Sequence, residues 1–212
     1  MPTVTQLTSK YISEHPSIKD CLAKGLINYS ALSRDIKKSI KDAKKNATFD
    51  AILIATRRFA DKNKHNRALE EGITSLLKKS EIEVKNKVVV VIIEKSVYPE
   101  NIIDLERSIK KNNDVFYLIE GSKQITLITT EKYLSDIDSL FKNRIIKKNV
   151  NKAIIDIKTS QKIENISGVL NYLTSLFAGN GVNIIECMSC WTDNLFVVSE
   201  EDISKVMGFL RF

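Results

Sequence analysis

The sequence has few of the residues that build disulfide frameworks and metal centres, and it has no long apolar run. Among 212 residues there are three cysteines, two histidines and one tryptophan. An odd, small number of cysteines fits a reducing compartment better than a disulfide framework. No stretch approaches the length of a membrane span, and the first residues lack the basic-then-apolar pattern of a signal peptide. We therefore expect a soluble, cytoplasmic protein with no membrane partner.

Motifs for catalysis and metal binding are missing too. The sequence contains no nucleophile–base set, phosphate loop or paired carboxylates. Cys187 and Cys190 have the spacing of a metal-binding pair, but zinc takes about four ligands and no second pair accompanies them. Because residues three apart in a strand point to opposite faces, we predict that both cysteines are buried packing residues. We expect a protein that is not an enzyme and that uses no cofactor and no metal.

Positive charge is present in excess, and it is unevenly distributed. The net charge is +7; residues 1–80 hold 16 Lys and Arg against 8 Asp and Glu, whereas residues 81–212 hold 17 against 18. This asymmetry predicts a separate basic module in residues 1–80 with a partner of its own. A nucleic acid is one candidate partner, and a lysine-coated, solvated helical surface is the other interpretation.

The basic module is predicted to be helical. Apolar residues recur at spacings of three and four in several segments, for example Leu32, Ile36 and Ile40. The module has the pattern of successive short helices and, as one possibility, of a winged-helix-like DNA-binding fold. In a helix–turn–helix, residues 30–41 would face a groove of DNA with four basic side chains. These candidate nucleic-acid-binding residues are Arg34, Lys37, Lys38 and Lys41.

From residue 81 the pattern changes to alternating strands and helices. Val88–Ile93 is a β-branched run typical of a buried strand, and it is followed by a helix, two strands and another helix. The same order recurs from Ala153–Ile157 onward, with corresponding elements 64 to 69 residues apart. Trp191 lies at the predicted turn between the last two strands. We predict two units of one supersecondary plan, residues 81–148 and 149–212.

Two short motifs in the second unit carry a resemblance to a known family. The run Ile166-Ser167-Gly168-Val169-Leu170 and the run Gly181-Val182-Asn183-Ile184 resemble the ACT domain, most closely the C-terminal regulatory pair of aspartokinases. The resemblance covers about a quarter of the chain. It implies an α+β fold with tandem ACT-like, ferredoxin-type βαββα units, and a protein that binds an amino acid or similar small effector.

The resemblance also implies where the effector binds. In ACT domains the loop before the first helix presents backbone N–H groups to the ligand's carboxylate, which suits the positive end of a helix dipole. We expect Asn165 to contact the ligand and Gly168 to allow close backbone approach. Ser167 stands where the family has proline. The first unit has no glycine in its corresponding segment, residues 95–101, and is expected to keep the fold without the site. The implied ligand-binding residues are Asn165, Ile166, Ser167, Gly168, Val169, Leu170, Gly181 and Asn183.

The sequence is compatible with more than one assembly and more than one output for such a protein. The second unit lacks a closing strand of its own, and either residues 143–147, residues 82–85 or a partner chain can fill that edge. An open edge predicts a homo-oligomer formed through the ACT-like units. Through residues 15–19, residues 25–30 and Arg57-Arg58-Phe59, the N-terminal third also resembles the leading region of archaeal stand-alone ACT proteins. We expect a non-enzymatic regulator that acts on transcription through DNA, or one that controls a partner enzyme by protein–protein contact without DNA.

Overall fold

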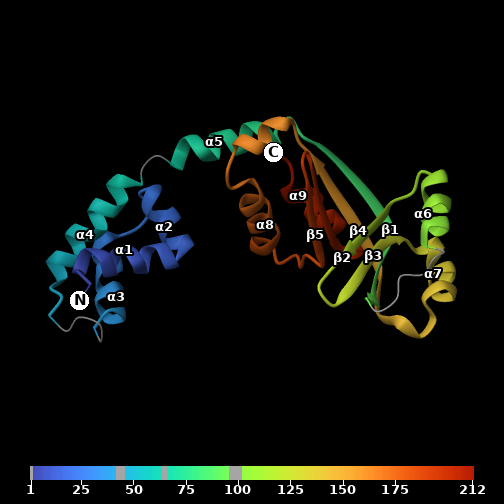
Figure 1. The fold of residues 1–212 in the computed structure, drawn as a ribbon. Helices are drawn as coiled ribbons and strands as arrows, with labels where there is room; N and C mark the ends of the chain where they lie inside the picture. The colour runs from blue at the N-terminus through green and yellow to red at the C-terminus, as the bar shows by residue number, and fades with distance from the viewer. Residues whose placement is uncertain (1, 42–45, 64–65, 96–101) are drawn as a thin grey trace. The chain divides into compact units, whose positions relative to one another are not determined.

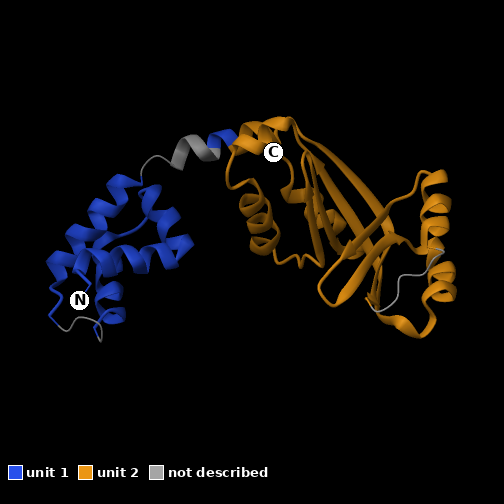
Figure 2. Ribbon diagram, in the orientation of Figure 1, with its two compact units in different colours: residues 1–72 blue, residues 73–212 orange. Residues whose placement is uncertain are grey.

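The computed structural model describes residues 2–41, 46–63, 66–95 and 102–212. The chain divides into two compact units, Met1–Gly72 and Ile73–Phe212, coloured separately in Figure 2. The boundary falls inside helix α5 (Asn66–Leu77) rather than after it. The last turn of α5 therefore belongs to the C-terminal unit.

The N-terminal unit is built from helices, as the spacing of its apolar residues predicts. Side chains cap three of them: Thr3 and Gln6 form a capping box at α1, and Asn28 and Thr48 accept hydrogen bonds from backbone N–H groups in the first turns of α3 and α4. The fully buried Ile12, Ile36 and Ile52 lie in one core. Residues 2–41, 46–63 and 66–72 contain no strand, so a β-hairpin wing is not among them. The helices are α1 (Val4–Glu14), α2 (Pro16–Ala23), α3 (Tyr29–Ser39) and α4 (Phe49–Lys62).

The C-terminal unit combines strands and helices, which confirms the α+β class. Residues 95–101 were expected to have lost the effector site of the first ACT-like unit. Of these, residues 96–101 lie outside the described residues. The order strand, helix, strand, strand, helix occurs twice. The elements are β1 (Glu81–Glu94), α6 (Ile102–Lys111), β2 (Phe116–Glu120), β3 (Gln124–Thr130), α7 (Leu134–Phe141), β4 (Ile145–Lys158), α8 (Val169–Gly179), β5 (Glu186–Cys190), β6 (Asp193–Ser199) and α9 (Ile203–Phe209).

The six strands form one antiparallel sheet in the order β2-β3-β1-β4-β6-β5. Its two central strands, β1 and β4, have 14 residues each and run the length of both halves. The second half of β1 pairs with the first half of β4, between Ile93↔Ile145 and Val90↔Asn149. The first half of β1 pairs with the second half of β4, between Glu81↔Lys158 and Lys85↔Ile154.

This pairing fills the edge that the sequence left open. Residues 81–85 lie beside β4 and form the outer strand of the second half-sheet, which also contains β4, β6 and β5. Residues 145–149 lie beside β1 and do the same for the first half-sheet, which also contains β1, β3 and β2. Of the three candidates for this edge, residues 82–85 are the ones that pair with β4 beside the second half, so this half does not need a partner chain to close it. Self-association stays a prediction, but it no longer rests on that edge.

The helices of this unit pack on one face of the sheet, and Figure 1 shows α8 beside β5 and α6 beside β3. Alternate strand residues, such as Ile155 and Phe196 or Val91 and Leu127, form the cores beneath the helices. The opposite face has a core of its own, in which Tyr117 of β2 and Met188 of β5 gather around the central strands. β2 and β5 are at opposite edges of the sheet, yet side chains from both belong to this one cluster. The sheet must therefore curve toward this face, which is concave.

Candidate functional site

The segment between β4 and α8 forms an open helix N-terminus. A 3-10 helix, Gln161–Asn165, is followed by Gly168, which is the N-cap of α8 and has φ +87°. A residue other than glycine pays a steric penalty at this φ, which explains why glycine occupies the position. No side chain caps α8. Its first N–H groups, at the positive end of the helix dipole, are therefore available to an anionic group of a ligand.

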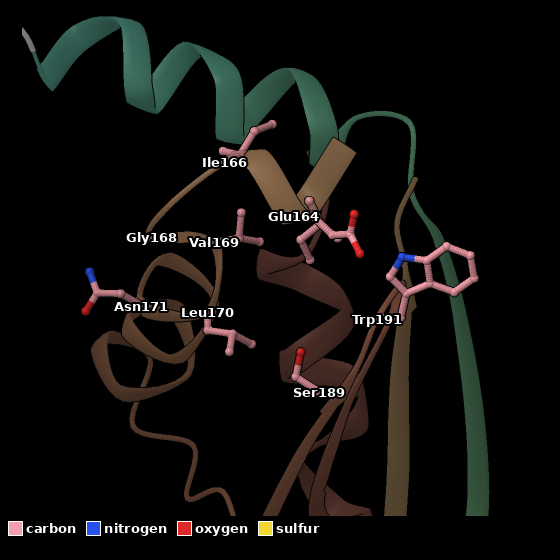
Figure 3. Close-up of a pocket in the computed structure, with 9 residues that line it drawn as sticks. Glu164, Ile166, Gly168, Val169, Leu170, Asn171, Ser189 and Trp191 are labelled. Atoms are coloured by element: carbon pink, nitrogen blue, oxygen red, sulfur yellow. The ribbon is translucent and has the colours of Figure 1, made fainter. Parts of the chain in front are cut away.

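A pocket of about 380 Å³ lies against this helix N-terminus (Figure 3). One wall is the 3-10 segment and the first turn of α8, and the opposite wall is Ser189 of β5 with Trp191 at the β5–β6 turn. Trp191 is 59% exposed and has φ +55°. The lining residues are Ile163, Glu164, Ile166, Gly168, Val169, Leu170, Asn171, Ser189 and Trp191.

The lining combines one charged group with mostly apolar walls. In Figure 3 the carboxylate of Glu164 faces the indole of Trp191, while the side chain of Asn171 points away from them. Asn171 therefore offers the pocket its backbone. The helix N-terminus suits a carboxylate, Glu164 suits an ammonium group, and Val169 and Leu170 suit a hydrocarbon side chain. A free amino acid carries all three of these groups.

Four of the eight expected ligand-binding residues line this pocket, namely Ile166, Gly168, Val169 and Leu170. Asn165 and Ser167 lie in the same loop and are exposed, but they are not among the lining residues.

The other two expected residues, Gly181 and Asn183, follow the far end of α8. The helix has 11 residues and is about 16 Å long, so they are separated from Gly168 by its whole length. Gly181 has φ +63° and shapes the turn that ends the helix. The two ACT-like motifs thus mark the two ends of one helix and do not meet at one pocket.

Sequence reasoning missed five lining residues: Ile163, Glu164, Asn171, Ser189 and Trp191. Glu164 lies two residues before Ile166, next to the predicted ligand contact Asn165. Ser189 and Trp191 come from the hairpin opposite α8. Their proximity depends on the order β4-β6-β5 in the sheet, which the sequence does not reveal.

The candidate nucleic-acid residues lie on and just after α3. Arg34, Lys37, Lys38 and Lys41 are all exposed, opposite the buried face that contains Ile36. Their spacing of three, four and seven residues places them on one side of the helix. Lys38 forms an ion pair of 3.5 Å with Asp35, and both side chains are largely exposed.

The prediction that Cys187 and Cys190 are buried is wrong, since both thiols are free and exposed. β5 is the outermost strand and has one neighbour, which leaves these side chains accessible. In the part of the chain that the structure describes, no three His, Cys, Asp or Glu side chains are grouped as metal ligands would be. No described helix combines the length and apolar character needed to span a membrane.

No protein-family model matches the sequence, and no curated protein matches it. Among solved structures, the chain is similar to aspartate kinase from Clostridium acetobutylicum, with 17% identity and a TM-score of 0.49, over 61% of this chain and 33% of that one. It is similar to the regulatory subunit of aspartate kinase from Thermus thermophilus, with 10% identity and a TM-score of 0.47, over 62% and 94% of the two chains. A regulatory domain of aspartate kinase from Porphyromonas gingivalis gives 14% identity and a TM-score of 0.44, over 62% and 94%. The matched part thus spans about a third of the Clostridium enzyme, and identities and TM-scores this low leave the family of the chain unassigned.

Proposed function

We propose that this chain is a non-enzymatic regulator of ACT type that binds a free amino acid in the pocket at the start of α8. The observation that carries the proposal is the pocket's combination of an uncapped helix N-terminus, the Glu164 carboxylate and apolar walls. The motif Ile166-Ser167-Gly168-Val169-Leu170, on which the resemblance rests, forms part of its lining. The half-sheet order also supports it, since four antiparallel strands with two helices on one face are the ferredoxin-type plan.

The lining favours an amino acid with an apolar side chain, because aliphatic groups and the Trp191 ring make up most of it. A thermal unfolding screen of the full chain against the amino acids tests this. A ligand at 100 times its dissociation constant stabilises the folded state by about 2.7 kcal/mol. For a unit of this size, that corresponds to a rise of about 5–10 °C in Tm.

Three compounds separate the contributions of the two charged ends. With leucine as the probe, 4-methylpentanoic acid lacks the amino group and 3-methylbutylamine lacks the carboxylate. The proposal expects both to bind this pocket more weakly than leucine, measured as the part of each Tm shift that Glu164→Gln removes. Glu164→Gln should reduce the leucine shift, and Glu201→Gln, on an exposed residue outside the pocket, is the matched control. If no amino acid shifts the Tm of the wild type, the pocket is not an amino-acid sensor.

We also propose that the N-terminal unit delivers the output, with duplex DNA as its first candidate target. The supporting observation is the exposed basic face made of Arg34, Lys37, Lys38 and Lys41. Binding should weaken steeply with salt, because each neutralised phosphate releases counterions. Arg34→Ala should reduce affinity at physiological salt, whereas Lys10→Ala, at an exposed position of α1, should change it little. A chain that ignores DNA even at low salt would favour the partner-enzyme alternative.

A further inference from the structure

A second cavity, of about 260 Å³, lies on the concave face of the sheet, on the side away from the helices. Its walls come from β1, β2, β4 and β6 and from the residue before β2. Because side chains along a strand alternate between the two faces, the lining residues are those that point away from α8 and α9. Nothing in the proposed amino-acid pocket is shared with it. Its lining residues are Glu83, Lys85, Val115, Tyr117, Ile154, Asp156, Lys158, Asp193 and Leu195.

The two lysines of this cavity are already paired. Lys158 forms an ion pair with Glu83, and Lys85 lies 3.0 Å from the carboxylate of Asp114, whose side chain is 6% exposed. The pKa of Lys158 is raised, chiefly by its hydrogen bond to Glu83. Both positive charges are therefore neutralised by carboxylates, which disfavours an anionic ligand.

Two carboxylates of the cavity lack such a partner. In residues 2–41, 46–63, 66–95 and 102–212, neither Asp156 nor Asp193 forms an ion pair with a lysine or arginine. Oδ1 of Asp156 is buried and has no hydrogen-bond partner within those residues. A buried acceptor without a donor is unusual in a folded protein and points to a missing ligand or solvent group. The pKa of Asp156 is raised, first by burial and then by the negative charge of Asp193.

The rest of the lining is apolar or aromatic. Val115, Ile154 and Leu195 form hydrocarbon walls, and the ring of Tyr117 lies in the same core. A metal ion gains nothing from such walls, whereas an organic cation with a short carbon chain contacts both parts of the lining. Aromatic faces also attract ammonium groups.

We propose that this cavity binds a small alkylammonium ligand, with its charged end between Asp156 and Asp193 and its carbon chain against Tyr117, Ile154 and Leu195. The ligand's N–H groups supply the donors that Asp156 lacks. Its positive charge offsets the two adjacent carboxylates. The site is independent of the amino-acid pocket and does not require that pocket to be functional.

Isothermal titration of the full chain with n-butylamine near neutral pH tests the proposal, because the probe is then fully protonated. Butan-1-ol, which has the same chain and no charge, is the matched ligand control. The proposal expects butylamine to bind and butan-1-ol to bind at least tenfold more weakly. Asp156→Asn keeps the shape of the side chain and should weaken butylamine at least tenfold, whereas Asp136→Asn, exposed on α7, should leave it unchanged.

The pH dependence gives an independent readout. The groups that face Asp156 are Glu83 and Lys85 of β1, Tyr117 of β2, Lys158 of β4 and Asp193 of β6. Because the pKa of Asp156 is raised, protons compete with the ligand, and affinity should fall as pH drops through that raised value. In Asp156→Asn the fall should be smaller.

Three results would overturn the proposal. They are no heat of binding with butylamine, equal binding of butan-1-ol, and undiminished binding to an Asp156→Asn variant whose circular dichroism matches the wild type. Glu164→Gln separates the two sites, since it should leave butylamine binding intact. Loss of leucine binding in that variant with retained butylamine binding would show that the cavities act separately.

Discussion

Replacement of Leu77 by alanine should destabilise the C-terminal unit strongly, although Leu77 lies in the helix that begins in the other unit. Its side chain is 1% exposed and packs in one core with Leu173 and Phe177 of α8. A buried Leu→Ala change leaves a cavity and costs about 3–4 kcal/mol. At about 2–4 °C per kcal/mol for a unit of this size, Tm should fall by about 10 °C.

Hydrogen exchange followed by mass spectrometry localises that effect. Peptides from α8 report on the C-terminal unit, and their slowest amides should exchange faster in Leu77→Ala by the factor that corresponds to the lost free energy. Leu26→Ala is the matched control, because Leu26 is 74% exposed and its replacement should change stability by less than about 0.5 kcal/mol. If α8 exchanges equally in the two variants, the last turn of α5 is not part of this core.

Other substitutions test separate features. Asp114→Asn should cost about 1 kcal/mol at pH 7, since Lys85 and Lys132 pair with this carboxylate but are themselves partly exposed. Burial opposes ionisation of Asp114, but hydrogen bonds from the two lysines outweigh burial and lower its pKa. The difference in unfolding free energy between wild type and variant should therefore persist above pH 4 and shrink as pH falls further. Denaturant unfolding at several pH values measures it. Ile36→Ala, at a fully buried position of the N-terminal core, should cost about 2–5 kcal/mol and appear as faster exchange in α3. Gly181→Ala should cost about 1–2 kcal/mol because φ is +63°, and an unchanged Tm would refute the strain argument.

The helices and the shorter strands were predictable because their apolar residues follow local periods. Ile36 and Ile40 mark one face of a helix, and the run Val88–Ile93 marks a strand buried on both faces. The first part of β1, residues 82–85, was named only as one of three candidates for the edge of the sheet. Its residues do alternate between polar and apolar side chains, with Ile82 and Val84 on one face and Glu83 and Lys85 on the other. Which strand it pairs with depends on the order of the whole sheet, which local alternation does not reveal.

The candidate site was predictable on one side only. Gly168 and its neighbours were identified through the resemblance to ACT domains, and the structure gives Gly168 the positive φ that glycine adopts most easily. The facing wall depends on strand order, a long-range property set by the packing of the whole sheet. Gly181 was grouped with that site because the family motif contains it, yet it serves the opposite end of α8.

The pairing of the two long strands shifts register three times, once through an extra residue in β1 and twice through an extra residue in β4, the last between Lys147 and Ile145. From Lys85 to Val88, three residue steps of β1 oppose two of β4, and Lys87 takes φ +52° at this bulge. Between Val88 and Val90 the imbalance is reversed, with the extra residue in β4, where Asn151 has φ +55°. An uncompensated shift of one residue would turn every following side chain to the other face.

Lys87 therefore allows a paired test. Lys87→Gly relieves the positive φ and should stabilise the C-terminal unit by about 1 kcal/mol, raising its Tm slightly. Deletion of Lys87 makes β1 a regular strand at this point, so Lys85 and Val88 stay on the concave face and Val89 and Val91 stay on the helix-covered face. Because no side chain has to change faces, the deletion variant should still unfold cooperatively as seen by calorimetry. A deletion variant without cooperative unfolding would show that β1 needs the extra residue to pair with β4.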